Sequence, residues 1–176
     1  VVMKYKHGYS ICISTQVGCR MGCTFCATGK SGFSRNLTAS EMLAQIQSAQ
    51  KDLGIQISNI VLMGMGEPLD NYQQVLRFLE LVSSDEGMNI GMRHISVSTC
   101  GIVDKIYDMA NRKLQCTLSV SLHAPNDNLR SQTMPINKKW GVAQLLKACK
   151  YYSDTTRRRI SFEYAMISGL NDSDAQ

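Results

Sequence analysis

The stretch Gln115-Cys-Thr-Leu-Ser-Val-Ser-Leu122 decides between the architectures open to this chain. Successive side chains of a β-strand point to opposite faces of the sheet. Thr117, Ser119 and Ser121 therefore share one face, which His123 continues, whereas leucine and valine occupy the other. A parallel strand that is covered on both faces normally reads as an unbroken apolar run. This strand is thus expected to have one face against helices and one polar face that must find a polar ligand or water.

The same alternation recurs in other predicted strands. The polar positions are Ser10, Cys12 and Ser14 in Ser10–Thr15, Ser96, Ser98 and Cys100 in and after His94–Thr99, and Ser161 and Glu163 in Ile160–Met166. Strands are also expected at Val1–Lys6 and Ile57–Met63, and helices from Thr38 or Ser40 to Gly54 and at Tyr72–Val82, Asp104–Arg112 and Val142–Tyr152. Strands that alternate with helices indicate βαβ units and a parallel sheet. The sequence predicts an α/β fold, a partial barrel of about five parallel core strands with outer helices. A solvent-facing open sheet is the alternative.

Composition excludes several classes of protein. An apolar content of 44% over 176 residues is typical of a globular domain and not of a disordered chain. No run approaches the roughly 18 apolar residues of a membrane span, and no signal-peptide pattern opens the chain. Seven cysteines, an odd number without an extracellular disulfide framework, favour a reducing cytoplasm. The net charge of +5 permits an anionic partner such as RNA.

Three cysteines are clustered in Cys19-Arg-Met-Gly-Cys23-Thr-Phe-Cys26, at the spacing C-x3-C-x2-C. Gly18 and Gly22 permit the backbone angles of a loop that wraps closely around a metal centre. A structural zinc site requires four ligands, usually in two separated pairs, and no second pair follows. A [4Fe–4S] cluster held by three cysteines would keep one iron open for another molecule. This is the favoured interpretation. Incidental core cysteines, or zinc with a distant fourth ligand such as Cys12 or His7, are the alternatives.

Polar residues also follow the predicted strands, at the end where α/β barrels gather their ligands. The segments are the cysteine loop, Gly64–Pro68, Thr99–Gly101 and His123–Pro125. Glu67 is placed to bind an ammonium group, or alternatively to balance a helix N-terminus. Ser98 and Ser121 offer hydroxyls. His123 offers a ring nitrogen, although a histidine satisfied within its own turn is the alternative. Because Gly64-Met-Gly-Glu67 is not a G-x-G-x-x-G motif, a nucleotide-binding Rossmann fold is disfavoured.

With Phe25 before its last cysteine, the C-x3-C-x2-C motif resembles the signature of radical S-adenosylmethionine (SAM) enzymes. The further segments that carry a resemblance are Cys12-Ile-Ser-Thr-Gln-Val-Gly-Cys19, Met63-Gly-Met-Gly-Glu-Pro68, Ser98-Thr-Cys-Gly101, Ser121-Leu-His-Ala-Pro-Asn126 and Met134-Pro-Ile-Asn137. Together they are similar to the RlmN family of dual-specificity RNA adenine-C2 methyltransferases, from about Cys12 to Asp172. The resemblance implies a (β/α)6 radical SAM barrel, a [4Fe–4S] cluster, SAM, and 23S rRNA and tRNA as substrates of a cytoplasmic enzyme.

The resemblance also implies roles for individual residues. Cys19, Cys23 and Cys26 correspond to the cluster ligands, and Gly66, Glu67, Ser98, Ser121, Leu122 and His123 to SAM contacts. Cys12 matches the cysteine that resolves a protein–RNA covalent intermediate by forming a disulfide, although its pattern alone is more typical of a core residue. Cys100, Cys116 and Cys149 match no chemical position and are expected to be packing residues.

The family uses two SAM molecules, one to methylate a protein cysteine and one to generate the radical that activates this methyl group for addition to adenine C2. The methyl-carrying cysteine, the last barrel strand and an N-terminal RNA-binding region have no counterpart here. Residues 1–176 are therefore expected to be an incomplete radical SAM core that cannot methylate RNA unaided. An electron donor such as flavodoxin or ferredoxin, no membrane and a monomeric state are also expected.

Three alternatives to the C2 methyltransferase remain open. A sister family methylates C8 of the same rRNA adenine, and Pro68 and Ala124 favour the C2 group over it. The others are a radical enzyme that activates a partner protein and an iron–sulfur electron-transfer module with no substrate. RNA phosphates have candidate contacts in Lys30, Arg35, Lys138 and Lys139.

Overall fold

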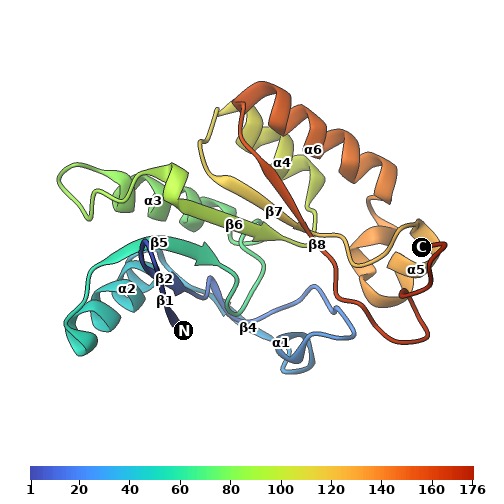
Figure 1. Cartoon of the computed structure of the whole chain (residues 1–176), viewed down its shortest axis with the longest axis horizontal. Coiled ribbons are helices and arrows are strands. Elements are labelled where there is room, and N and C mark those ends of the chain that lie inside the picture. The colour runs from blue at the N-terminus through green and yellow to red at the C-terminus, as the bar shows by residue number, and fades with distance from the viewer.

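A six-stranded sheet forms the centre of the computed structural model, which describes residues 1–176 (Figure 1). The strands are β1 (Val2–Tyr5), β2 (Gly8–Cys12), β5 (Ile57–Leu62), β6 (Ile95–Thr99), β7 (Thr117–Ser121) and β8 (Ile160–Glu163), adjacent in that order. β1 pairs antiparallel with β2, and every later pair is parallel. The predicted α/β fold with five parallel core strands is confirmed. β1 and β8 do not pair with each other, so the sheet is open.

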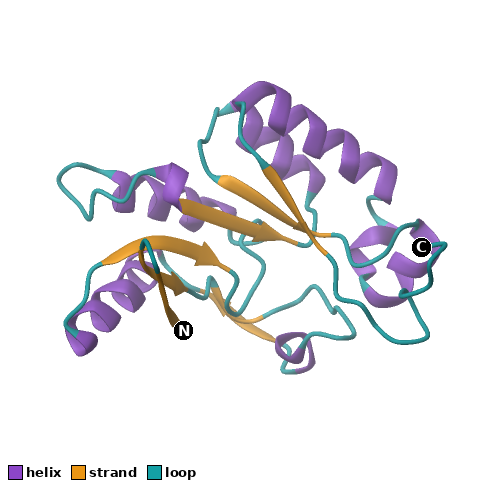
Figure 2. Ribbon diagram, viewed as in Figure 1, coloured by secondary structure: helices purple, strands orange, loops and turns teal.

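Four long helices connect the strands and lie on the outside of the sheet (Figure 2). They are α2 (Ala39–Leu53), α3 (Tyr72–Ser83), α4 (Val103–Asn111) and α6 (Val142–Thr156), each close to its predicted position. Thr38 begins α2 through a capping box with Glu41, and Gly54 ends it at φ 62°, as the Thr and Gly signals predict. The longest helices have 15 residues, and none has the length and hydropathy of a membrane span.

Several short elements were not predicted. They are the antiparallel pair β3 (Gln16–Gly18) and β4 (Phe33–Asn36), the helical turn α1 (Ala27–Lys30), the helix α5 (Asp127–Thr133) and the 3-10 turns η1 (Met92–His94) and η2 (Pro135–Lys138). They are too short to show a clear period in the sequence. Two predicted strands also differ from the structure, because β2 begins at Gly8 and ends at Cys12, and β8 ends at Glu163. The β3–β4 pair and α1 hold the cysteine loop between them, below the sheet in Figure 1.

The hydrophobic core lies between the helices and one face of the sheet. Buried residues of this face include Ile11, Ile60, Leu62, Val97, Leu118 and Val120. They belong to a single cluster with helix residues such as Met42, Phe78, Ile106, Leu145 and Tyr152. Because register pairs Val97 with Leu118 and Ser98 with Ser119, apolar and polar positions form separate continuous faces across the strands.

The opposite face of the sheet is polar and lines open cavities. Ser10, Ser96, Thr117, Ser119 and Ser161 line a cavity of about 290 Å³ towards the amino ends of the strands. The hydroxyls of Ser96 and Ser119 lie 2.9 Å apart. The predicted polar face is confirmed, although the sheet that carries it is open, as in the alternative.

Candidate active site

A second cavity, of about 210 Å³, opens at the carboxyl ends of β5 to β8. The predicted site residues that line it are Cys19, Cys23, Cys26, Gly66, Glu67, Ser98, Ser121 and His123. Only Cys12 and Leu122 of the predicted set are outside this lining. The fold therefore gathers segments that are widely separated in sequence around one space, as strand polarity predicts.

Backbone geometry shapes the cysteine loop. Gly18 has φ 78°, and a Cβ there would lie 1.9 Å from the carbonyl oxygen of Gly32, so only glycine fits. Beside it, the Cys19 N–H donates to the same Gly32 carbonyl at 2.8 Å. The Cys26 N–H donates to the Cys23 carbonyl at 3.2 Å, just before α1 begins. The loop thus turns tightly and directs residues 19, 23 and 26 to one cavity.

The three loop cysteines are free, partly buried thiols. Burial raises the pKa of Cys19, and raises that of Cys23 to about 11, where the neighbouring cysteines add to the shift. The protein alone therefore keeps the Cys19 and Cys23 thiols protonated, and their ionisation requires a positive ligand, such as a metal centre. No set of three or more His, Cys, Asp or Glu side chains is arranged around a single ion. The donor set, three thiols from one loop at one partly desolvated cavity, fits a [4Fe–4S] cluster.

Gln16, which the sequence did not single out, anchors the loop to the strand ends. Its side chain is fully buried, and its Oε1 accepts from the Glu67 N–H at 2.9 Å. Its Nε2 donates to Asp70 Oδ2 at 2.7 Å, and Arg20 of the cysteine loop pairs with the same oxygen at 2.9 Å. Gly66, at φ 100°, would place a Cβ 2.5 Å from the Gln16 Cβ. The close packing of Gln16 against the backbone at position 66 therefore requires glycine there.

Glu67 is a buried carboxylate that joins two strand ends. Its Oε1 accepts from the Leu69 N–H at 2.9 Å, and its Oε2 accepts from the Cys100 N–H at 2.7 Å. Burial raises the pKa of Glu67, and these backbone hydrogen bonds oppose the rise. Glu67 lies outside α3, whose first turn contains no acidic residue, so the alternative of a charge that balances a helix N-terminus finds no support in this helix. Glu67 remains part of the cavity lining, where the ammonium contact is still a prediction.

Glu163 is a second carboxylate at the cavity, outside the predicted site. Its Oε2 accepts from the Ser121 hydroxyl at 3.1 Å and from the Ser98 hydroxyl at 3.4 Å. Register makes this possible, because Glu163 is the Cα partner of Ser121. The polar alternation of the last strand was the signal that placed Glu163 on this face.

His123 is held in one tautomer by the segment after β8, and not by its own turn. It has φ 56°, and its Nδ1 accepts from the Ala165 N–H at 2.9 Å. Burial lowers the pKa of His123, and the positive charge of Arg130 lowers it further. The neutral ring therefore carries its proton on Nε2. Phe25 packs edge-on against the ring at a centroid distance of 4.8 Å, which closes the loop over the ends of the strands.

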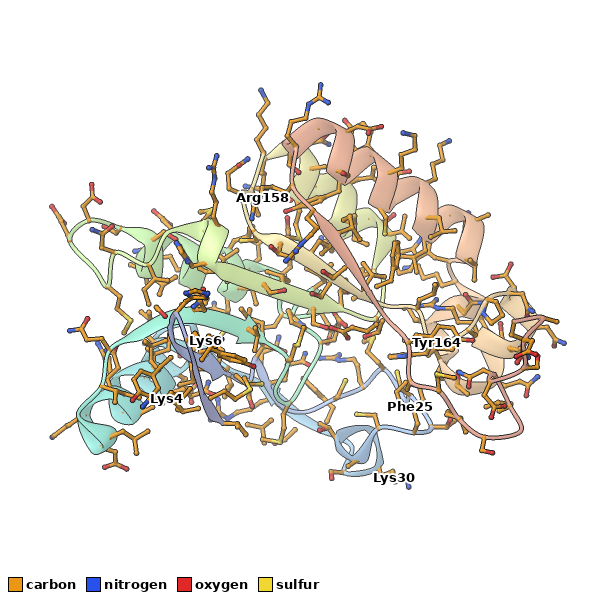
Figure 3. The ribbon with its side chains drawn as sticks, in the orientation of Figure 1. Lys4, Lys6, Phe25, Lys30, Arg158 and Tyr164 are labelled. Carbon is orange, nitrogen blue, oxygen red and sulfur yellow. The ribbon has the colours of Figure 1, made fainter.

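Figure 3 shows where the loop side chains point. Phe25 lies below the segment that carries Tyr164, at the carboxyl end of β8, whereas Lys30 points outward from α1. Arg158 lies at the other end of β8. Phe25 is thus part of the cavity lining, and the candidate RNA contact Lys30 is at the periphery.

Leu122 and Cys12 lie away from the cavity lining. The Leu122 side chain packs against the core, its N–H donates to the Glu163 carbonyl at 3.0 Å, and its carbonyl accepts from Arg130 Nε at 3.0 Å. Both of its backbone polar groups are therefore engaged within the protein. Cys12 ends β2 opposite Val61, on the same face as Ser10.

The other cysteines divide into two kinds. Cys116 and Cys149 belong to the hydrophobic core, so their predicted packing role is confirmed. Cys100 is buried as well, but it also lines the cavity, and its backbone N–H donates to Glu67. Cys100 follows β6 directly, and strand polarity places such a residue at the site end.

A profile of the Radical SAM superfamily matches residues 13–176. The chain belongs to the radical SAM superfamily. Membership implies a [4Fe–4S] cluster and SAM as cofactors, as predicted.

Close relatives and a solved structure agree with this membership. Over 173 residues and 98% of its length, the chain is 58% identical to the probable dual-specificity RNA methyltransferase RlmN of Clostridium novyi and covers 50% of that protein. The corresponding protein of Clostridium botulinum strain Langeland is 60% identical, with 98% of this chain and 51% of the relative covered. A radical SAM methyltransferase from Sphaerobacter thermophilus superposes with a TM-score of 0.95 at 48% identity, covering 99% of this chain and 52% of that one. The chain thus spans about half the length of the relatives that it matches.

Proposed function

We propose that residues 1–176 are the cofactor-binding core of a radical SAM enzyme that methylates C2 of an adenine in 23S rRNA and in tRNA. The observation that carries the proposal is the cavity at the strand ends, where three thiols of one loop meet Glu67 and Glu163. Similarity to proteins named dual-specificity RNA methyltransferases supports RNA as the substrate class. Radical chemistry also suits adenine C2 as the methylated position, because an unactivated aromatic carbon does not react in ordinary nucleophilic methyl transfer.

Cys19, Cys23 and Cys26 would hold the cluster, which keeps one iron open. When bound, the cluster supplies the electron that cleaves SAM into methionine and a 5′-deoxyadenosyl radical. The residues around it bind and orient SAM. Glu67 offers a buried carboxylate to the ammonium group, next to Gly66, whose missing side chain lets Gln16 pack against this turn.

Other residues of the cavity lining offer several hydrogen-bonding groups to the rest of SAM. Ser98 and Ser121 keep their hydroxyls oriented by donating to Glu163, and His123 keeps a free Nε2–H. Apolar residues that line the same cavity, Met21, Phe25, Leu62, Met63 and Met134, restrict water around a reactive radical.

Cys12 would resolve the covalent protein–RNA intermediate by disulfide formation. Its partner, the cysteine that carries the methyl group, has no counterpart in residues 1–176. We therefore propose that these residues bind both cofactors and cleave SAM but cannot complete methyl transfer by themselves. A flavodoxin or ferredoxin as the reductant, a monomeric state and a cytoplasmic location belong to the same proposal.

Anaerobic reconstitution with iron and sulfide, followed by reduction in the presence of SAM, tests the cofactor half of the proposal. Formation of 5′-deoxyadenosine is expected, and the variant Cys23→Ala should form none. A wild-type protein that holds iron and sulfide but leaves SAM intact would support an electron-transfer module instead.

Nucleoside analysis of 23S rRNA and tRNA from cells that express the complete gene tests the RNA half. Formation of 2-methyladenosine that depends on Cys23 is expected. Formation of 8-methyladenosine would assign the protein to the sister activity, and the absence of both products would contradict an RNA methyltransferase.

A further inference from the structure

Arg130, on α5, is the largest fully buried side chain of the molecule, with an exposure of 0%. A buried charge is costly unless hydrogen bonds and an opposite charge compensate for it. None of the ion pairs of this chain includes Arg130. No carboxylate therefore contacts the guanidinium directly, which calls for an explanation.

The guanidinium of Arg130 fastens the carboxyl ends of two core strands together. Its Nη2 donates to the carbonyl of Cys100, just after β6, at 2.6 Å, and to that of Ser121, at the end of β7, at 3.0 Å. Its Nε donates to the Leu122 carbonyl at 3.0 Å. Its Nη1 donates to Asn137 Oδ1, on η2, at 3.0 Å. The planar fork of an arginine can hold such a set of acceptors in fixed positions.

Arg130 also fixes the α5–η2 corner, residues 127–138, to these strand ends. Within the corner, the Asn137 amide donates to Asp127 Oδ1 at 3.0 Å and to the Ser131 hydroxyl at 2.9 Å. The Met134 N–H donates to the Arg130 carbonyl at 2.8 Å. Corner and strand ends therefore form one hydrogen-bonded unit with the guanidinium at its centre.

The cysteine loop rests on this corner. The Thr24 N–H, between Cys23 and Cys26, donates to the Thr133 carbonyl at 2.9 Å. On the other side of Cys23, the Cβ position of Gly22 lies 3.6 Å from Pro135 Cγ. Any movement of the corner would thus be transmitted to both sides of Cys23.

We propose that Arg130 is a positioning residue that sets the cysteine loop against the ends of β6 and β7 and places a permanent positive charge behind the cluster. The inference rests on the proposed cluster ligands and goes beyond them, because Arg130 itself contacts no ligand. Three ionised thiolates would add negative charge to this region, where no carboxylate contacts the guanidinium directly. Groups behind a metal centre that orient its ligands commonly change affinity about 10-fold or more when they are replaced.

The test compares Arg130→Lys and Arg130→Gln in anaerobically reconstituted protein. Lys keeps the charge and loses the fork, whereas Gln loses both. Three quantities are measured: the rate of iron release to a chelator, the midpoint potential of the cluster and the melting temperature with and without the cluster. Arg77→Gln is the matched control, because it removes the same charge from an exposed residue on α3.

We expect both Arg130 variants to release iron about 10-fold faster than the wild type. Only Arg130→Gln should lower the midpoint potential, since an added electron is then less well compensated, and only this variant should gain less thermal stability from the cluster. Arg77→Gln should behave as the wild type in every measurement.

The proposal would be overturned if Arg130→Gln left both the rate of iron release and the midpoint potential unchanged. Equal midpoint potentials in Arg130→Lys and Arg130→Gln would contradict the proposed effect of the positive charge on the cluster. If Arg130→Gln does not fold, Arg130→Lys and Asn137→Ala decide, because each removes only part of the hydrogen-bond set. Wild-type iron release in both would then contradict the positioning role. A wild-type protein that takes up no cluster would instead refute the proposed function.

Discussion

The two cavities on the polar face of the sheet differ in chemistry although they share the same strands. The cavity at the amino ends, about 290 Å³, is the larger, yet no carboxylate and no thiol lines it. The cavity at the carboxyl ends, about 210 Å³, contains Glu67, Glu163 and the three loop cysteines. Alternation along a strand makes the whole face polar, but the segments that follow the carboxyl ends supply the reactive groups. The position of a cavity along the strands, and not its size, therefore identifies the site.

The degree of internal order also differs between the two cavities. At the amino ends, the hydrogen bonds between neighbouring segments include Ser96 with Ser119 and His94 with Asn59 at 3.2 Å. At the carboxyl ends, Glu67 joins the ends of β5 and β6, and Arg130 joins the ends of β6 and β7. Such preorganisation is what a site for a large polar cofactor requires.

The largest effect is expected from replacement of a loop cysteine. Cys23→Ala should abolish iron–sulfide uptake, because two thiols on one loop cannot hold the cluster that three hold. Ser96→Ala, at the amino-end cavity, should take up a full complement. Chemical analysis of iron and sulfide after anaerobic reconstitution measures both. Equal uptake by the two variants would erase the proposed difference between the cavities.

The next largest effect concerns Gly66. The substitution Gly66→Ala would force a Cβ to within 2.5 Å of Gln16 at φ 100°, so we expect a loss of about 1–3 kcal/mol in unfolding free energy and loss of SAM binding. Gly91→Ala is the control, because nothing lies within 4 Å of its Cβ position and its φ is negative. Urea denaturation and equilibrium binding measure the two effects. The idea fails if the Gly66 and Gly91 variants are equally stable.

A smaller effect is a pH dependence that comes from Glu67. Burial raises the pKa of Glu67 in the folded protein above that in the unfolded chain. The protonated side chain therefore favours the folded state below the ordinary glutamate pKa, and this stabilisation is lost as the pH rises through the raised pKa. We therefore expect Glu67→Gln to gain stability relative to the wild type in cluster-free protein as the pH rises above the ordinary glutamate pKa of about 4.3.

Urea midpoints of the two proteins along this pH series provide the measurement. Glu41→Gln is the opposite control, because Arg35 lowers the pKa of Glu41 to about 2, and this variant should show no relative gain with rising pH. A difference between wild type and Glu67→Gln that is constant with pH would contradict the raised pKa.

The smallest effect is expected at the serines. Ser121→Ala removes a hydroxyl that donates to Glu163 at 3.1 Å, and should weaken SAM binding by about 1 kcal/mol, or roughly fivefold. Ser119→Ala, on the same strand but at the amino-end cavity, should leave SAM affinity unchanged. Binding titrations of the two variants compare the cavities directly, and a Ser119 effect as large as that of Ser121 would undermine the distinction.

Much of the fold could be predicted from local patterns in the sequence. The alternation of Ser96–Thr99 and Thr117–Ser121 gave the strands and their polar face, and the Thr38 and Gly54 signals gave the limits of α2. The β3–β4 pair could not be predicted, because its strands are short and are joined by contacts such as that of Gly18 with Gly32.

The site was predictable where chemistry follows a motif, and less so where it depends on packing. The C-x3-C-x2-C spacing and the strand polarity brought the cysteines and Glu67 together in the prediction. Gln16, Arg130 and Glu163 escaped it, because their roles arise from hydrogen bonds between distant segments. Cys100 was predicted as a packing residue, although its position directly after β6 already indicated the cavity that it lines.

The central claim is that three cysteines hold a cluster whose open iron faces the cavity at the strand ends. Electron paramagnetic resonance of the reduced, anaerobically reconstituted protein, with and without SAM labelled with ¹⁵N at its amino group, tests this claim most directly. The account predicts that SAM changes the spectrum and that the ¹⁵N nucleus couples to the cluster. An unchanged spectrum without coupling, or a protein that holds stoichiometric zinc and no iron, would contradict it.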